Sequence, residues 1–191
     1  MTTSHAIPRL LIYARLVCAP LVLFAAFSGW PGTSLIAIAA VALVTDYFDG
    51  VIARRLKIDT AALRHFDSQA DTVFYFAAGI ALFVRFPAAW HDFRFSIALL
   101  VFVELGRMFF EWRKFGRPAA YHMWSAKLWG VSMLAGFVEV ALGGGGPFMF
   151  AAIVIGCLTN IEGLIASLAL KEPHHDVPTA WHALRIARGR Q

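Results

Sequence analysis

The stretch "TDYFDGVIARRLKIDTAALRHFDSQAD", residues 45–71, decides the fold and points to the chemistry of this chain. Asp46 and Asp49 are three residues apart near the end of one apolar run. Asp67 and Asp71 are four residues apart at the start of the next. Residues at these spacings lie on one face of an α-helix. The short connection between the two runs predicts antiparallel neighbouring helices whose four carboxylates meet.

The sequence around this stretch has the composition of a membrane protein. Of its 191 residues, 59% are hydrophobic and 15% are charged, and the mean hydropathy is +0.65. A soluble domain is usually about 45–50% apolar and about 25% charged. We therefore expect an all-α fold, a single domain over residues 1–191 built as a six-helix transmembrane bundle with spans of about 20 residues. The expected spans are Leu10–Phe27, Thr33–Arg54, Phe66–Phe86, Phe95–Trp112, Trp124–Leu142 and Pro147–Leu170.

Lys and Arg residues are distributed unequally between the two sides of this bundle. Thirteen fall on one side, and only Arg85 and Arg94 fall on the other. Such an excess marks the cytoplasmic side, so we expect cytoplasmic termini, a cytoplasmic tail at 172–191 and a site that faces the cytoplasm of a bacterial inner membrane. The thirteen are Arg9, Arg15, Arg54, Arg55, Lys57, Arg64, Arg113, Lys114, Arg117, Lys171, Arg185, Arg188 and Arg190.

The net charge of +5 fits this topology better than a role with nucleic acid. No RNA-binding signature or aromatic-basic repeat is present, and we expect no nucleic-acid partner. Basic residues beside apolar spans instead attract anionic lipids or nucleotides. In the tail, Trp181, Leu184 and Ile186 have helical spacing, so this segment is either an interfacial helix or a disordered tail.

Four carboxylates below a membrane surface require compensating cations. Insertion of one Asp near the centre of a span costs roughly 2.5–3.5 kcal/mol, and mutual repulsion adds to that cost. Hard divalent ions prefer oxygen ligands, so Asp46, Asp49, Asp67 and Asp71 are candidate ligands of Mg²⁺ or Mn²⁺, with two ions expected. Pairing of the acids with nearby arginines is the alternative. It does not explain why the acids, a glycine and a small residue share one face.

Three further residues of the stretch suit the handling of a phosphate. Gly50 and Ala53 lie beside the acids and leave room for a ligand to approach. Arg54 can contact a diphosphate with two hydrogen bonds. Taken alone, each residue has an alternative role. Gly50 could serve ordinary helix packing, and Arg54 could be one of the basic residues that flank a span on the cytoplasmic side.

The stretch resembles the signature of the CDP-alcohol phosphotransferases (also called CDP-alcohol phosphatidyltransferases), D-x2-D-G-x2-A-R-x8-G-x3-D-x3-D. It departs from this pattern at Leu63, where the family has its second glycine next to the bound nucleotide. The opening "AIPRLLIYARLVCAP" is similar to the usual start of the family at Pro8 and Arg15, but Arg9 and Ile12 replace polar residues. The matching signature residues are Asp46, Asp49, Gly50, Ala53, Arg54, Asp67 and Asp71.

The resemblance implies roles by position. Asp46, Asp49 and Asp67 correspond to metal ligands, and Asp71 corresponds to a further ligand or to the base that takes the proton of the acceptor hydroxyl. The glycine, alanine and arginine of the signature correspond to contacts of the donor nucleotide. The residue at Leu63 puts the binding of cytidine in doubt.

The implied reaction belongs to phospholipid biosynthesis. An alcohol oxygen attacks the lipid-proximal phosphate of a CDP-lipid such as CDP-diacylglycerol, and CMP is released. We expect a homodimer surrounded by membrane lipids. An ion transporter is the rival from another class, because acids within membranes also mark ion pathways, but these acids cluster near one surface. A non-catalytic relative is a second rival that only Leu63 supports.

Two cations inside otherwise apolar spans, Arg107 and Lys127, are candidate ligands of an acceptor phosphate. Glu104, three residues before Arg107, is a possible alternative partner for it. Arg and Lys bind phosphate through charge-assisted hydrogen bonds. We therefore expect glycerol 3-phosphate as the acceptor, as in phosphatidylglycerophosphate synthases of the family. The alternatives are inositol phosphate, inositol, another free polyol or serine.

Overall fold

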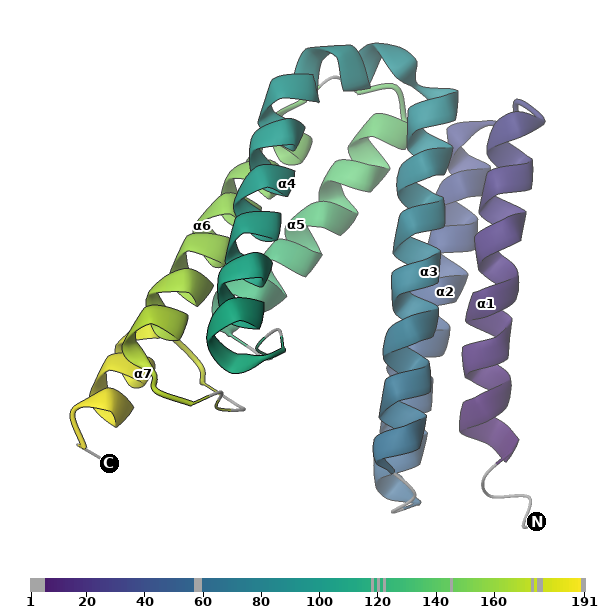
Figure 1. Cartoon of the computed structure of the whole chain (residues 1–191). Coiled ribbons are helices and arrows are strands. Elements are labelled where there is room, and N and C mark those ends of the chain that lie inside the picture. Colours follow the sequence, from purple (N-terminus) through teal and green to yellow (C-terminus); the bar gives the residue numbers. More distant parts are fainter. Residues whose placement is uncertain are drawn as a thin grey trace. The chain divides into compact units, whose positions relative to one another are not determined.

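The chain is helical throughout its regular structure. The computed structural model describes residues 6–56, 60–117, 119, 121, 123–144, 146–172, 174 and 177–189. Within this part of the chain there are seven α-helices and no strands (Figure 1). The all-α class expected from the sequence is confirmed. The helices are α1 (Ala6–Phe27), α2 (Gly32–Arg55), α3 (Ala61–Arg85), α4 (Pro87–Phe115), α5 (Trp124–Ala141), α6 (Pro147–Ala169) and α7 (Ala180–Ala187).

The first six helices coincide with the six apolar segments of the sequence. Three of them are long and apolar enough to cross a membrane, over Arg9–Phe27, Gly32–Ile52 and Pro147–Ala169. These segments belong to α1, α2 and α6. Charged side chains make α3, α4 and α5 less apolar. The chain is therefore a membrane protein with three clear candidate spans, and the six-span arrangement belongs to the proposal below.

Helices α1, α3 and α4 begin four or more residues before their apolar segments, and the starts of α3 and α4 have a local cause. Helix α3 begins at Ala61 rather than Phe66, because the side chain of Thr60 accepts a hydrogen bond of 3.2 Å from the amide of Leu63 and so caps the first turn. Helix α4 begins at Pro87 rather than Phe95, and proline suits the first turn of a helix because it lacks an N–H that would need a partner there. A side-chain cap for α3 and a proline at the first position of α4 thus favour helix before the apolar runs.

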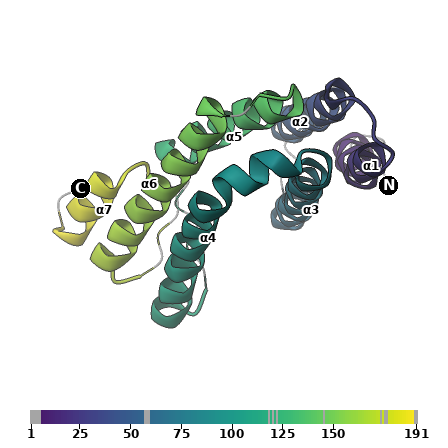
Figure 2. The same cartoon turned by 90° about the horizontal axis from the view of Figure 1, so that it is seen from above.

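The chain forms two compact units, and each is described by itself. The first consists of residues 1–88 with 141–144, and the second of residues 89–140 with 145–191. In the first unit, α1 packs against both α2 and α3, whereas α2 and α3 contact each other little. Figure 2 shows these three helices nearly end-on. Their buried faces are rich in alanine, which lets helices approach closely in a membrane. Examples are Ala25, Ala39, Ala70 and Ala81.

Consecutive helices in the first unit run antiparallel. The N-terminus of α1, the C-terminus of α2 and the N-terminus of α3 therefore lie at the same end of the unit (Figure 1). Residues at equal distances from these three termini consequently lie in one layer. This arrangement positions the signature residues of α2 and α3 opposite each other.

The second unit contains α4 to α7. The short helix α7 is held against α6, because the carboxylate of Glu162 accepts a 3.0 Å hydrogen bond from the amide of Ala180. A disordered tail is thus wrong for residues 180–187, which form a capped helix. Its buried side joins a small apolar cluster at the end of α6. The cluster consists of Tyr121, Met123, Ala166, Leu170, Val177 and Ala183.

Candidate active site

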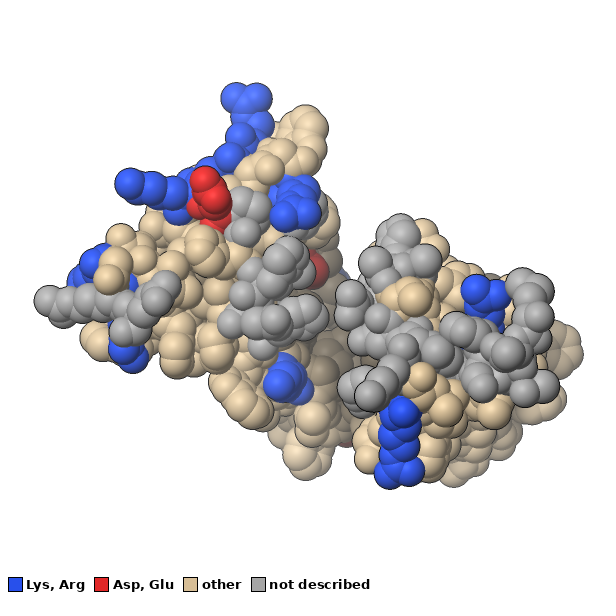
Figure 3. All heavy atoms as spheres, turned by 90° about the horizontal axis from the view of Figure 1, so that it is seen from below, with Lys and Arg blue, Asp and Glu red and all other residues tan. Residues whose placement is uncertain are grey.

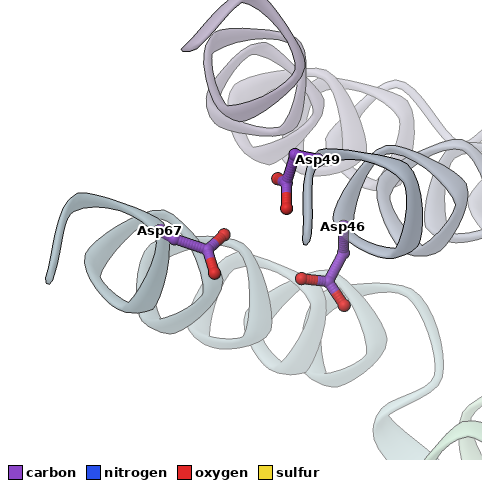
Figure 4. Close-up of side chains that lie close together, drawn as sticks. All are labelled: Asp46, Asp49 and Asp67. Atoms are coloured by element: carbon purple, nitrogen blue, oxygen red, sulfur yellow. The ribbon is translucent and has the colours of Figure 1, made fainter. Parts of the chain in front are cut away.

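The aspartates of α2 and α3 point toward one another. Carboxylate oxygens of Asp46, Asp49 and Asp67 all lie within 4.8 Å of each other (Figure 4). Asp49 is buried, and its side chain is 4% exposed. The other two are about one-third exposed, at 37% for Asp46 and 32% for Asp67. The site is thus closed on the Asp49 side and accessible from the other.

These carboxylates lie well inside the first unit rather than at its end. Asp46 is nine residues before the end of α2 at Arg55, which is about 14 Å at 1.5 Å per residue. Asp71 is ten residues after the start of α3 at Ala61, or about 15 Å. The two antiparallel helices therefore bring the pairs to a common depth, as their spacing in the sequence indicates.

Arg15 of α1 lies at the centre of the acidic cluster. Its side chain is 1% exposed, and its guanidinium forms ion pairs with all four aspartates. Nη1 donates to Asp67 at 2.8 Å and also contacts Asp71. Nη2 lies 3.2 Å from Asp46 and also contacts Asp49. Arg15 therefore connects both aspartate pairs.

Sequence reasoning missed this role of Arg15, which it counted toward topology and matched to the usual start of the family. Its partners are distant in the sequence: Asp67 and Asp71 on α3 are 52 and 56 residues away, and Asp49 on α2 is 34 residues away. Local spacing therefore gives no indication of them. One signal was available. A cation nine residues into an apolar helix is costly to bury unless an acid meets it, and the four aspartates of the signature lie together in residues 46–71.

The charges of the cluster favour additional cations. Among the side chains that the structure describes, four carboxylates face one guanidinium, so the cluster offers more carboxylate oxygens than Arg15 can neutralise. Carboxylate oxygens are the donors that Mg²⁺ and Mn²⁺ prefer. The donor set therefore fits the expected metal site.

The structure describes only some of the residues that are expected to contact the donor nucleotide. Gly50 follows Asp49 on α2 and is half-buried, and Leu63 is half-buried in the first turn of α3. The backbone of Ala53 and Arg54 belongs to α2, but the side chains of these two residues lie outside what the structure describes. The structure therefore leaves their expected contacts as a proposal.

Arg107 lies in the second unit and has protein partners. Its Nη1 donates to Glu111 at 2.9 Å, and its Nε donates to the side-chain oxygen of Asn160 at 2.8 Å. Glu104, which sequence spacing offered as the alternative partner, is replaced by Glu111, one turn further along α4. The side chain of Arg107 remains 20% exposed.

Glu111, a fully buried acid of the second unit, was missed by sequence reasoning. Its side chain is 0% exposed, and besides Arg107 it accepts hydrogen bonds from the hydroxyl of Ser167 at 2.8 Å and the amide of Ala119 at 2.9 Å. Because the Ser167 hydroxyl donates to Glu111, the 2.8 Å bond between Tyr121 and Ser167 has Tyr121 as its donor. Burial raises the pKa of Tyr121, which keeps this donor protonated.

Lys127, the other candidate acceptor ligand, lies on the exposed surface of α5. Its ammonium stands 4.2 Å from the ring centroid of Trp124 on the same helix, a favourable cation–π distance. An exposed lysine on an aromatic face remains available to an anion. Its role toward an acceptor stays a proposal.

The comparisons with known proteins give one match. A family model described as CDP-alcohol phosphatidyltransferase matches residues 5–170, which is most of the chain. No curated protein and no solved structure matches it. The matched range includes α1 to α6 and every residue of the acidic cluster.

Proposed function

The chain belongs to the CDP-alcohol phosphatidyltransferase family, a family of phosphotransferases that take a phosphatidyl group from a CDP-alcohol, and from this premise we propose its donor, acceptor and metal site. The donor is a CDP-lipid such as CDP-diacylglycerol, and the acceptor is glycerol 3-phosphate. Mg²⁺ or Mn²⁺, as two ions, is held by Asp46, Asp49, Asp67 and Asp71. The reaction releases CMP.

One observation carries this proposal. The acids that the family signature places on two helices come together around a common point, with oxygens of three of them within 4.8 Å. Divalent ions at this point would neutralise the diphosphate of the donor and stabilise the leaving phosphate. The protein's own contribution is to hold four carboxylates at one depth and to exclude water on the buried side of Asp49. Positioning and charge neutralisation dominate catalysis of phosphoryl transfer.

Asp71 is the candidate for proton transfer. Its carboxylate belongs to the same cluster through Arg15 and is 31% exposed, so it is accessible from outside. We propose that Asp71 either completes the metal site or takes the proton of the acceptor hydroxyl, as the family suggests. For either role Asp71 must lie at about the same distance from the end of the first unit as Asp46, as it does.

The test of this function is formation of a lipid product. Purified protein, CDP-diacylglycerol, Mg²⁺ and glycerol 3-phosphate should give a phosphorylated glycerophospholipid. Inositol phosphate, inositol and serine belong in the same experiment as alternative acceptors. Turnover of an unphosphorylated alcohol faster than of its phosphate would contradict the proposed acceptor.

Leu63 should affect the donor. The side chain occupies the position of the family glycine near the nucleotide, so Leu63→Gly should lower the KM for the CDP-lipid and leave the acceptor KM nearly unchanged. Leu63→Ala is the matched variant, because it removes bulk without the cost of glycine in a helix, about 1 kcal/mol. An unchanged or higher donor KM in both variants would show that the fold accommodates Leu63.

Arg107 and Lys127 should affect the acceptor. We propose that they bind its phosphate, so Arg107→Gln and Lys127→Gln should each raise the KM for glycerol 3-phosphate by about tenfold, the loss of one charge-assisted hydrogen bond, and change the donor KM little. Arg94→Gln, which removes an exposed arginine of α4, is the control. Equal changes in both KM values would argue for a general effect on the fold instead.

The membrane orientation is supported by the end of the second unit that carries α7. Three exposed tryptophans gather in the segments that end there, Trp112 at 58%, Trp124 at 64% and Trp181 at 64%. The left part of Figure 3, which holds α4 to α7, shows blue Lys and Arg side chains and little red on this face. Tryptophan and basic residues together mark a membrane–water interface on its cytoplasmic side. This supports six spans with cytoplasmic termini in a bacterial inner membrane.

Helix α7 adds to this orientation. Its first residue, Ala180, is bonded to Glu162, which lies seven residues before the end of α6, or about 10 Å along the helix. The helix therefore lies beside the last turns of a candidate span, where Trp181 and Ile186 are exposed. Amphipathic helices with such residues lie in the interface. We propose that α7 rests on the cytoplasmic leaflet.

A further inference from the structure

The guanidinium of Arg15 lies among the carboxylates that are the candidate metal ligands. It reaches Asp46 and Asp49 on α2 through Nη2, and Asp67 and Asp71 on α3 through Nη1. Of the Lys and Arg side chains that the structure describes, only Arg15 forms ion pairs with these acids. Within the described part of the chain, this one side chain thus serves as counter-ion to all four acids.

The arrangement around Arg15 is incomplete in two respects. Among the described side chains one guanidinium faces four carboxylates, and it cannot neutralise all of them when they are ionised. In addition, the Nε atom of Arg15 is buried and has no hydrogen-bond partner among the residues that the structure describes. Buried N–H groups in folded proteins are nearly always bonded, so an unsatisfied donor at the centre of a site indicates that another oxygen ligand completes it. An arginine that served only to join three helices would be expected to have all its donors bonded.

We propose that Arg15 and the divalent metal compete for the same carboxylate oxygens, and that loading of the site moves the guanidinium from the acids to the phosphates of the donor. This inference rests on the proposed function. The guanidinium of Arg15 and the metal ions would neutralise the same carboxylates. The guanidinium therefore cannot keep all its contacts with the acids when the metal is bound. Once displaced, the guanidinium stays on α1 beside the site, where its planar fork matches phosphate oxygens. Arg15 is then a positioning residue for the donor.

Competition has opposite consequences for stability and for metal affinity. Arg15→Gln removes the counter-ion, so the acids repel one another and the metal-free protein should unfold at a lower temperature. The same change removes the competitor, so Mn²⁺ should bind about tenfold more tightly, in the usual range for coupled binding. Mn²⁺ should therefore raise the unfolding temperature of the variant more than that of the wild type.

The experiment measures binding of Mn²⁺ alone to the purified full chain in detergent, together with unfolding temperatures with and without Mn²⁺. Arg9→Gln is the matched control, because it removes an exposed arginine from the same helix. It should behave like the wild type in both measurements. Arg15→Lys keeps the charge but makes fewer contacts, so its Mn²⁺ affinity should lie between those of the wild type and Arg15→Gln.

The outcomes separate this inference from the proposed function. Mn²⁺ affinity in Arg15→Gln that is unchanged or weaker, with wild-type binding intact, would show that Arg15 is a permanent structural residue and would overturn the inference. Absence of Mn²⁺ binding in the wild type and in both Arg15 variants would instead contradict the metal site itself. If Arg15→Gln folds only in the presence of Mn²⁺, the inference is supported. If Arg15→Gln folds neither with nor without Mn²⁺, then an unchanged Mn²⁺ affinity in Arg15→Lys would overturn the inference.

Discussion

Asp49→Asn should reduce turnover by about a hundredfold or more, because a metal ion contributes several kcal/mol of charge stabilisation in the transition state and each 1.36 kcal/mol is a factor of ten. Asp49 is the most buried acid of the cluster, so no solvent-exposed side chain can replace it easily. The amide has nearly the same shape as the carboxylate. The variant should remain folded, since it removes one of four mutually repelling charges. Turnover is measured as product formed at saturating Mg²⁺.

Asp92→Asn is the control for this prediction. Asp92 lies on α4, and its side chain is 71% exposed. This variant should retain wild-type turnover, while Asp46→Asn and Asp67→Asn should resemble Asp49→Asn. Retention of more than about a tenth of the activity in the three cluster variants, a loss below 1.4 kcal/mol, would contradict their assignment as metal ligands.

Arg107→Leu should have the largest effect on stability. It removes a charged partner from Glu111, whose side chain is fully buried. Breaking a buried ion pair from one side typically costs about 3–5 kcal/mol, because the remaining charge is left uncompensated. Replacing both residues by leucine should cost less than the sum of the two single changes. The measurement is the free energy of unfolding of each variant in detergent.

Arg113→Leu is the matched control, an exposed arginine on the same helix. Its effect should stay within about 0.5 kcal/mol. If Arg107→Leu destabilises the protein no more than this control, the pair with Glu111 has no structural role. Arg107 would then be free to bind an acceptor phosphate only, and its substitution would change acceptor KM without a change in stability.

The helices could be predicted from the sequence because they coincide with long apolar runs bounded by Gly and Pro. The starts of α3 and α4 could not, because Thr60 and Pro87 favour helix outside the apolar runs. The length of α4 was therefore underestimated by eight residues at its start. Membrane spans were expected for all six runs. Of the helices in the described part of the chain, only α1, α2 and α6 are apolar enough to be recognised without further argument.

The acidic cluster was predictable because helical spacing places each aspartate pair on one face and a short connection makes the two helices antiparallel. The position of Arg15 was not, because it depends on how α1 packs against both helices. The partner of Arg107 was also not predictable. Glu104 and Glu111 are both within reach on one helix, and the choice of Glu111 depends on Ser167 and Ala119, which come from other segments.

The central claim is metal-dependent transfer from a CDP-lipid at the aspartate cluster, and release of CMP tests it most directly. Purified protein with CDP-diacylglycerol and glycerol 3-phosphate should release CMP in the presence of Mg²⁺ or Mn²⁺. Removal of the metal with a chelator should stop the release, and added metal should restore it. Asp49→Asn should give no more CMP than the chelated wild type. CMP release that continues at the wild-type rate in the chelator or in Asp49→Asn would contradict the account.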